Sequence, residues 1–281
     1  MWALVTGSSS GIGRDMARYL YGLGYSLILV ARNEEGLKAI KSELEEKANL
    51  VKDANTDTDY DKSKNLKKIE VSQEQQILVI PKDLSKKEEC MELYKETKNI
   101  SLDLLVNNAG FGEFGEFTET DLDKEVNLIN TNITAVHILT KLYLKDMIER
   151  NSGNILNVAS IAGMEPGPLM AAYYASKAYV IRLSRAINKE IKKKKSKVKI
   201  SILCPGPVDT NFNNVAKVVF KAPSMPSEKV AKYGIDKALK GKLIIIPGIL
   251  NKSVRFFSKI VPDCILEECA YHIQRRKKDL I

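Results

Sequence analysis

Short apolar runs recur along the chain, and segments with helical periodicity lie between them. Seven runs are found, at residues 2–5, 27–30, 77–80, 102–106, 154–159, 198–203 and 243–246. A strand that is apolar throughout is buried on both faces, which happens when helices cover both sides of a parallel sheet. The alternation therefore predicts an α/β fold, a doubly wound, seven-stranded parallel sheet with helices on both faces and right-handed crossovers.

The segments between the runs predict the helices of this fold. Apolar residues at helical spacing indicate helices at 12–23, 33–47, 86–98, 121–149 and 173–193, and a further one that begins near Ser227.

Two segments do not belong to the alternation. Residues 48–75 are rich in Lys, Asp, Asn and Thr, which predicts an exposed surface insertion. Residues 248–281 are apolar and basic by turns and are interrupted by Pro262, which predicts a C-terminal helical extension.

Composition excludes several classes of protein. The 281 residues are 44% hydrophobic and 28% charged, which is close to the soluble average and rules out a disordered chain or a disulfide scaffold. Four cysteines without a C-x-x-C pair, and only two histidines, give no structural metal site and favour a reduced, cytoplasmic location. Part of the net charge of +9 lies in seven lysines at 189–199, interpreted as a solvated helix end rather than a nucleic-acid site.

A glycine-rich turn connects the first strand to the first helix. It reads Thr6-Gly-Ser-Ser-Ser-Gly-Ile-Gly13, with glycines at positions 7, 11 and 13. Glycines let the backbone approach a phosphate closely, and the free N–H groups at the start of a helix hold the anion. Because the turn lies in a βαβ unit, it predicts a dinucleotide site that includes Gly7, Ser9, Ser10, Gly11, Ile12 and Gly13.

Further motifs follow in order along the chain. Asn107-Asn-Ala-Gly110 ends the fourth strand, Ser160 ends the fifth, Tyr173-Tyr-Ala-Ser-Lys177 opens a helix, and Pro205-Gly-Pro-Val-Asp-Thr210 follows the sixth strand. With the glycine turn, this set resembles the short-chain dehydrogenase/reductase family from residue 3 to about residue 247. The resemblance implies a Rossmann-type NAD(P)-binding domain at 1–247 that carries the catalytic residues, followed by the extension at 248–281. Residues 164–170 and 226–230 are more weakly similar to the branch with 3-oxoacyl and hydroxysteroid reductases.

Three residues provide acid–base chemistry. Tyr173 and Lys177 are four residues apart, so they share a helix face, and a nearby ammonium is expected to lower the pKa of the phenol. The hydroxyl of Ser160 is suited to orient a carbonyl group. Tyr174 is the alternative acid, but Tyr173 has the i, i+4 relation to Lys177 and the family's spacing from Ser160. By resemblance, Asn132 takes the fourth catalytic place and holds a water that links Lys177 to solvent.

The end of the second strand indicates the cofactor. Ala31 stands where an acidic residue would bind the ribose of NAD, and the guanidinium of Arg32 can pair with a 2′-phosphate. NADP(H) is therefore expected. The resemblance assigns further cofactor contacts to Asp83 at the adenine, to Lys177 at the ribose beside Tyr173, to Asn107, Ala109 and Gly110 along the groove, and to Pro205, Val208 and Thr210 near the nicotinamide.

The loops that border the substrate are apolar. Residues 162–169 and 211–226 carry Met, Pro, Leu, Phe and Val, which favours an apolar or acyl-chain carbonyl compound. The expected function is NADPH-dependent reduction of a ketone or aldehyde to an alcohol. Two alternatives remain: a cofactor-binding regulator without turnover, and a membrane-surface or assembly module that acts through 248–281. The resemblance implies a homo-dimer or tetramer; membrane contact by the C-terminal segment is not favoured.

Overall fold

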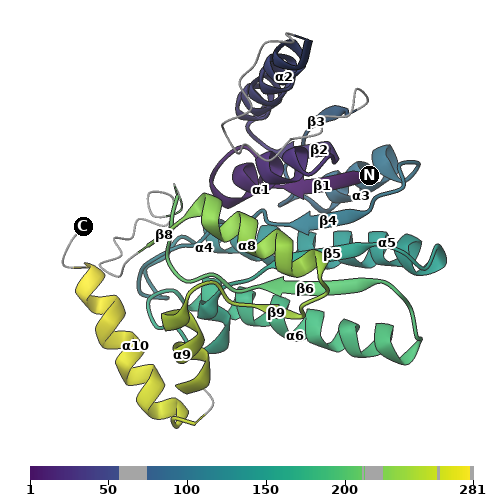
Figure 1. The fold of residues 1–281 in the computed structure, drawn as a ribbon. Coiled ribbons are helices and arrows are strands. Elements are labelled where there is room, and N and C mark those ends of the chain that lie inside the picture. The colour runs from purple at the N-terminus through teal and green to yellow at the C-terminus, as the bar shows by residue number, and fades with distance from the viewer. Residues whose placement is uncertain (57–74, 211, 213–223, 258–259, 279–281) are drawn as a thin grey trace.

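The computed structural model of the chain describes residues 1–56, 75–210, 212, 224–257 and 260–278. Seven parallel strands form the main sheet in the order β3-β2-β1-β4-β5-β6-β9 (Figure 1). Their bounds are β1 Trp2–Thr6, β2 Ser26–Ala31, β3 Ile77–Pro81, β4 Leu104–Asn107, β5 Asn154–Val158, β6 Lys199–Leu203 and β9 Ile244–Ile245. The predicted seven-stranded parallel sheet of the Rossmann type is confirmed.

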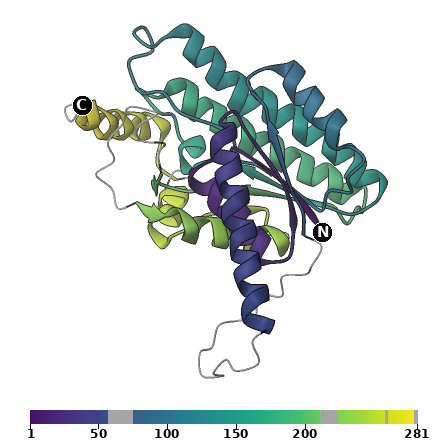
Figure 2. The ribbon, with the colours of Figure 1, turned by 90° about the horizontal axis from the view of Figure 1, so that it is seen from above.

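Helices cover both faces of the sheet (Figure 2). Their bounds are α1 Gly11–Gly22, α2 Glu34–Thr56, α3 Lys87–Thr97, α4 Leu122–Ile129, α5 Val136–Glu149, α6 Ala171–Lys193 and α8 Ser227–Leu239. Apolar residues of α1, α2 and α8 pack with one set of strand residues, and those of α3, α5 and α6 pack with the alternate set. Strand residues such as Leu4 and Val5 therefore face opposite helical layers, as their uniform apolar character predicts.

The structure corrects two helix predictions. Helix α2 does not end at Lys47 but continues through Thr56, so the predicted insertion at 48–75 begins as helix; residues 57–74 lie outside the described residues. The predicted helix at 121–149 is interrupted by a π-helical turn, η1 (Asn130–Ala135), between α4 and α5. A π turn widens the helix by one residue and often lies at a functional site.

Several short elements were not predicted. Strands β7 (Val208–Asp209) and β8 (Met225–Pro226) form a separate parallel pair, and a 3₁₀ turn, η2 (Ile161–Met164), follows β5. The segment after β9, where a helical extension was predicted at 248–281, contains α9 (Ile249–Phe257) and α10 (Asp263–Lys278).

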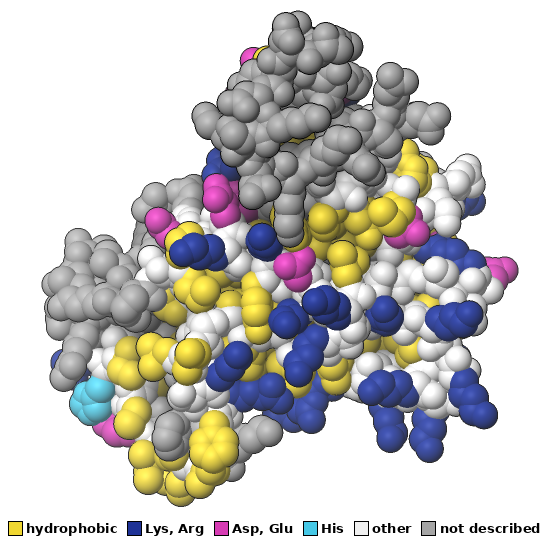
Figure 3. Space-filling view, in the orientation of Figure 1, with side chains coloured by type: hydrophobic (Ala, Val, Ile, Leu, Met, Phe, Trp, Pro, Cys, Tyr) yellow, Lys and Arg dark blue, Asp and Glu magenta, His cyan; other side chains and the backbone are white. Residues whose placement is uncertain are grey.

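Hydrophobic side chains gather on the surface where α9 and α10 lie, at the lower left of Figure 3. In these helices Ile249, Leu250 and Phe256 are exposed by 83%, 69% and 61%. None of the helices in the described part of the chain has the length and apolar character needed to cross a bilayer.

Candidate active site

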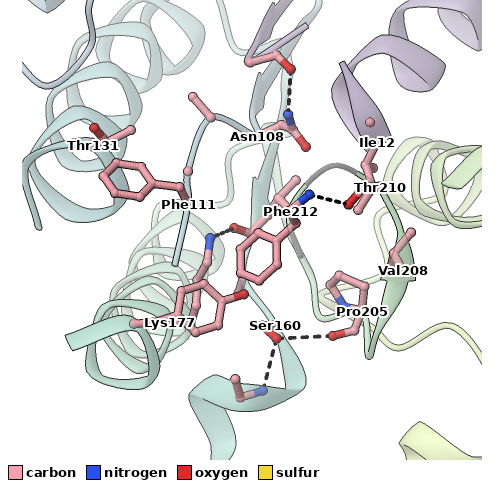
Figure 4. A pocket seen from close by; sticks show the side chains of 18 of the residues that line it. Ile12, Asn108, Phe111, Thr131, Ser160, Lys177, Pro205, Val208, Thr210 and Phe212 are labelled. Carbon is pink, nitrogen blue, oxygen red and sulfur yellow. Dashed lines mark hydrogen bonds between the residues drawn. The ribbon is translucent and has the colours of Figure 1, made fainter. Parts of the chain in front are cut away.

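A cavity of about 800 Å³ lies at the carboxyl ends of the central strands (Figure 4). The turns that follow β1, β4, β5 and β6 meet there, beside the point where β1 pairs with β2 on one side and β4 on the other. Ligands bind at this position in open α/β sheets. Of the predicted site residues, the cavity is lined by Gly7, Ser9, Ser10, Gly11, Ile12, Arg32, Asp83, Ala109, Gly110, Ser160, Tyr173, Lys177, Pro205, Val208 and Thr210.

The glycine turn forms one wall of the cavity. Gly7 and Gly11 have φ angles of +64° and +54°, which a side chain would strain. Gly13 does not line the cavity and has a different role. A Cβ atom on Gly13 would lie 2.3 Å from the carbonyl oxygen of Gly7, so its lack of a side chain allows α1 to start directly against the turn.

Hydrogen bonds join the glycine turn to the turn after β4. The hydroxyl of Thr6 accepts from the backbone N–H groups of Asn108 (2.9 Å) and Ala109 (3.0 Å). The side-chain amide of Asn108 donates to the carbonyl oxygens of Thr6 (3.0 Å) and Gly7 (3.2 Å). The side chains of Thr6 and Asn108 therefore hold the glycine turn and the turn after β4 together.

Asn107 does not line the cavity, contrary to the sequence-based expectation. Its side chain is buried, 2% exposed, and its amide donates to Asn157 Oδ1 (2.8 Å) and Thr140 Oγ1 (3.0 Å). Asn107 is the last residue of β4 and its side chain points into the core, whereas Asn108, which follows the strand, lines the cavity. The motif was placed correctly, but its first residue has a structural role.

Ser160, Tyr173 and Lys177 all line the cavity. Ser160 and Lys177 lie close to one another in Figure 4, and the hydroxyl of Tyr173 is hydrogen-bonded to Ser160. Ser160 caps η2: its hydroxyl accepts from the N–H of Ala162 (3.1 Å) and donates to the carbonyl of Pro205 (3.3 Å). Tyr173 and Lys177 occupy the first two turns of α6, and the ammonium of Lys177 lies 5.8 Å from the centroid of the Tyr173 ring. The i, i+4 spacing thus places both groups at the cavity.

Burial controls the protonation of this pair. It raises the pKa of Tyr173 to about 12; a hydrogen bond with Ser160 lowers the pKa and the neighbouring Tyr174 raises it. Burial lowers the pKa of Lys177 to about 8. The expected lowering of the tyrosine pKa by the ammonium is not seen, because desolvation of the phenolate dominates. At neutral pH the phenol keeps its proton, and most of the lysine is charged.

Asn132 lies in the π turn η1 and is fully buried. Its Oδ1 accepts from the N–H of Phe111 (3.1 Å), and its Nδ2 donates to the carbonyl of Phe111 (2.9 Å) and to the hydroxyl of Ser176 (3.0 Å). A Cβ atom on Gly110 would lie 2.8 Å from Asn132 Oδ1 and 3.3 Å from Lys177 Nζ. Asn132 therefore holds the turn after β4 against α6 without lining the cavity; its role in a water relay stays a prediction.

Arg32 and Asp83 also line the cavity. They follow β2 and β3, which lie on the other side of β1 from the strands that precede Ser160 and Tyr173. Arg32 is exposed, and Ala31 before it is buried. The carboxylate of Asp83 accepts from the N–H (3.1 Å) and the hydroxyl (2.8 Å) of Ser85. Lys82, which the sequence analysis did not single out, also lines the cavity, and its ammonium pairs with two glutamates of α3.

The segment after β6 passes beside the glycine turn. A Cβ atom on Gly11 would lie 3.2 Å from the methyl group of Thr210. Phe212 packs against Tyr173, with ring centroids 5.3 Å apart. Of the apolar loop predicted at 211–226, residues 211 and 213–223 lie outside the described residues.

The C-terminal helices contribute residues that the sequence analysis missed. Leu250 and Asn251 of α9 and Ile273 of α10 line the cavity. The side-chain amide of Gln274 donates to the hydroxyl of Tyr174, 2.7 Å away. The alternation of apolar and polar residues at 248–281 was the available signal, but it did not indicate which surface these helices cover.

The residues present fit a dinucleotide. The cradle at Gly7 and Gly11 admits no side chain and stands at the start of α1. Arg32 lines the same cavity, and the residue before it is Ala31 rather than an acid. A volume of about 800 Å³ is in the range of cofactor sites.

Comparisons with known proteins agree with this geometry. The family model described as short chain dehydrogenase matches residues 1–69 and 58–218. A very-long-chain 3-oxoacyl-CoA reductase of Rattus norvegicus is 31% identical over 263 residues, which are 89% of this chain and 74% of that protein. One from Anas platyrhynchos is 31% identical over 228 residues, 79% of this chain and 64% of the relative, so the chain spans less than two thirds of that protein.

Solved structures share the fold. A short-chain dehydrogenase from Sphingobium yanoikuyae in complex with NADPH has a TM-score of 0.75 at 21% identity, with 93% of this chain and 96% of that chain covered. A short chain dehydrogenase/reductase from Burkholderia phymatum in complex with NAD has a TM-score of 0.75 at 22% identity, with 92% of each chain covered. Proteins of this fold therefore include binders of either nicotinamide cofactor.

Proposed function

Because the chain belongs to the short-chain dehydrogenase/reductase family of oxidoreductases, we propose that it is an NADPH-dependent reductase of apolar ketones or aldehydes. The observation that carries the proposal is the convergence of Ser160, Tyr173 and Lys177 on the cavity that contains the glycine cradle. A proton donor, a carbonyl-orienting hydroxyl and a dinucleotide site are the parts that carbonyl reduction requires.

Each residue has a distinct part in the reaction. The hydroxyl of Ser160 orients the substrate oxygen, and Tyr173 donates its proton to that oxygen as the alcohol forms. A nicotinamide cofactor held by the glycine turn and Lys177 would supply a hydride to the carbonyl carbon. Lys177 binds the ribose side of the cofactor and provides positive charge near the phenol, which favours release of its proton. Asn132 supports the relay that returns a proton to the site.

The protonation states favour the reductive direction. Because burial raises the pKa of Tyr173 to about 12, the residue is a protonated acid at neutral pH. Oxidation of an alcohol needs the phenolate instead, so the pKa works against that direction. A good general acid near its substrate contributes roughly 10²- to 10⁴-fold to the rate.

Preference for NADPH is supported by the end of β2. Arg32 lines the cavity, and the preceding Ala31 contributes no carboxylate that would repel a 2′-phosphate. Guanidinium groups pair with phosphate oxygens by charge-assisted hydrogen bonds. Thermal unfolding with NADPH and with NADH at matched concentrations tests this part, because a ligand at about 100 times its Kd stabilises the folded state by roughly 2.7 kcal/mol.

An apolar or acyl-chain substrate is supported by the cavity wall and by the relatives. Met170, Phe212 and Leu250 are among the apolar residues that line the cavity, and Phe212 packs against the Tyr173 ring. Two relatives are named as very-long-chain 3-oxoacyl-CoA reductases. Assembly into a homo-dimer or tetramer belongs to the same proposal.

The deciding experiment is a screen of carbonyl compounds for consumption of NADPH. Turnover of apolar ketones that is lost in Tyr173→Phe supports the proposal. Cofactor binding without turnover on any compound would favour a cofactor-binding regulator instead.

A further inference from the structure

One polar cluster interrupts the apolar side of the cavity. Glu165 follows η2, Tyr174 lies in the first turn of α6, and Gln274 reaches Tyr174 from α10. Glu165 and Tyr174 both line the cavity, among Met170, Leu250 and other apolar residues. The proposed reaction uses none of these three polar side chains.

Tyr174 is held from two sides. A Cβ atom on Gly167 would lie 2.1 Å from the Tyr174 ring, so the loop after η2 packs directly on the ring face. On the other side, Gln274 is 2% exposed and its Nε2 donates to the tyrosine oxygen at 2.7 Å. A side-chain amide nitrogen can only donate, so this bond leaves the O–H of Tyr174 available for a different partner.

Glu165 provides an acceptor beside that donor. Burial raises the pKa of its carboxyl, and its charge contributes to raising the pKa of Tyr174 to about 12. Within the described part of the chain, no hydrogen bond or ion pair engages the Glu165 carboxylate. Both groups are half-buried, so a ligand group that donates to the carboxylate and accepts from the phenol would complete their hydrogen bonding.

We propose that Tyr174 and Glu165 bind a hydroxyl group of the substrate that is separate from the reacting carbonyl. A hydroxyl accepts from Tyr174 and donates to Glu165, whereas a simple ketone offers neither group at this place. Gln274 acts through Tyr174 as a positioning residue, which makes α10 part of substrate selection. The inference rests on the proposed reductase function and specifies its substrate class as a hydroxylated apolar ketone.

The test compares linear ketones that carry a terminal hydroxyl with their deoxy counterparts, over a series of chain lengths. The readout is the ratio of kcat/KM for each pair with NADPH. At least one length is expected to favour the hydroxyketone by about tenfold or more, since sites built to bind a hydroxyl discriminate strongly against analogues that lack it. Tyr174→Phe and Glu165→Leu should each bring that ratio close to one.

Gln274 gives the sharpest variant. In Gln274→Glu the side chain keeps its length but accepts the tyrosine proton, so the preference should fall even though a contact between α10 and α6 remains. Tyr179→Phe is the matched control: Tyr179 is also on α6, but its hydroxyl bonds to His137 at 2.7 Å and it does not line the cavity. It should leave the ratio unchanged.

The outcomes separate the two proposals. Reduction of simple ketones with a ratio near one at every chain length overturns this inference alone. Equal effects of Tyr174→Phe and Tyr179→Phe on the ratio also overturn it. Absence of turnover on every compound overturns the reductase function and this inference with it.

Discussion

The ammonium of Lys177 donates a hydrogen bond to the carbonyl oxygen of Val158, 3.1 Å away. This bond joins the helix that carries Tyr173 to the end of β5, two residues before Ser160. A Cβ atom on Gly163 would lie 2.5 Å from the backbone carbon of Lys177, so η2 is seated against the same turn of α6. The positions of Ser160, Tyr173 and Lys177 relative to one another are therefore fixed by direct contacts between β5, η2 and α6.

Replacement of Tyr173 by Phe removes the proposed acid and little else. Reduction of the carbonyl should slow by at least about 10²-fold, the lower end of what general acids contribute. Thermal stabilisation by NADPH should persist, because the ring and its packing remain. The matched variant Tyr174→Phe should retain turnover of simple ketones; a greater loss in Tyr174→Phe than in Tyr173→Phe would reverse the assignment of the acid.

The rate of reduction should depend on pH through Lys177. Its pKa is about 8, so the charged form predominates below that pH and disappears as the pH rises through it. We expect kcat for reduction to fall as the pH rises through about 8, without a contribution from Tyr173, whose pKa is about 12.

Lys177→Arg provides the check on this pH profile. A guanidinium stays charged to beyond about pH 12, so the decline near pH 8 should vanish whatever the absolute rate of the variant. A decline that is identical in both proteins would assign it to another group.

Loss of the Arg32 guanidinium should weaken the binding of NADPH more than the binding of NADH. A hydrogen bond to a charged group contributes about 1.5–3 kcal/mol, so Arg32→Ala should raise the Kd for NADPH by roughly tenfold or more. The Kd for NADH should change little, and Arg32→Lys should keep part of the preference. Titration with both cofactors measures this; an equal loss for each would mean that Arg32 does not select the 2′-phosphate.

Alanine substitutions at two glycines of α1, Gly13 and Gly22, should have opposite effects on the stability of the folded protein. In Gly13→Ala the new methyl group meets the backbone of Gly7 at 2.3 Å, and overpacking of this kind typically costs about 1–3 kcal/mol. In Gly22→Ala no heavy atom lies within 4 Å of the new methyl group. The variant should be as stable as the parent or more stable, because alanine loses less backbone entropy on folding than glycine does.

Urea unfolding should therefore show a lower midpoint for Gly13→Ala and an unchanged or higher one for Gly22→Ala. Stabilisation by NADPH should also decrease in the first variant only. Equal midpoints would mean that α1 shifts away from the turn at little cost.

The sheet could be predicted from the sequence because its signals are local. Each of the seven apolar runs forms a strand of the main sheet, and the motifs at the strand ends meet at one edge because parallel strands end there together. The extension of α2 to Thr56 escaped prediction because its last turns carry Asp, Asn and Thr, which have low helix propensity.

Other features depend on contacts that no local pattern encodes. The π turn around Asn132 contains no Gly or Pro that would have marked an interruption of the helix. The direction of the Asn107 side chain depends on its bonds to Asn157 and Thr140, which come from neighbouring elements. Gln274 and Tyr174 are 100 residues apart in the sequence, so no local pattern around either residue predicts the hydrogen bond between them.

The place of β1 at the centre of the sheet also bears on how the protein is made. Thr6 bonds to Val106, 100 residues later, and β1 is paired on that side only by β4. During synthesis on the ribosome, one edge of β1 therefore stays unpaired until β4 has been made. Unpaired strand edges favour aggregation. Nascent chains arrested before residue 104 should be sensitive to protease and should recruit chaperones, whereas chains that extend past β4 should begin to resist digestion.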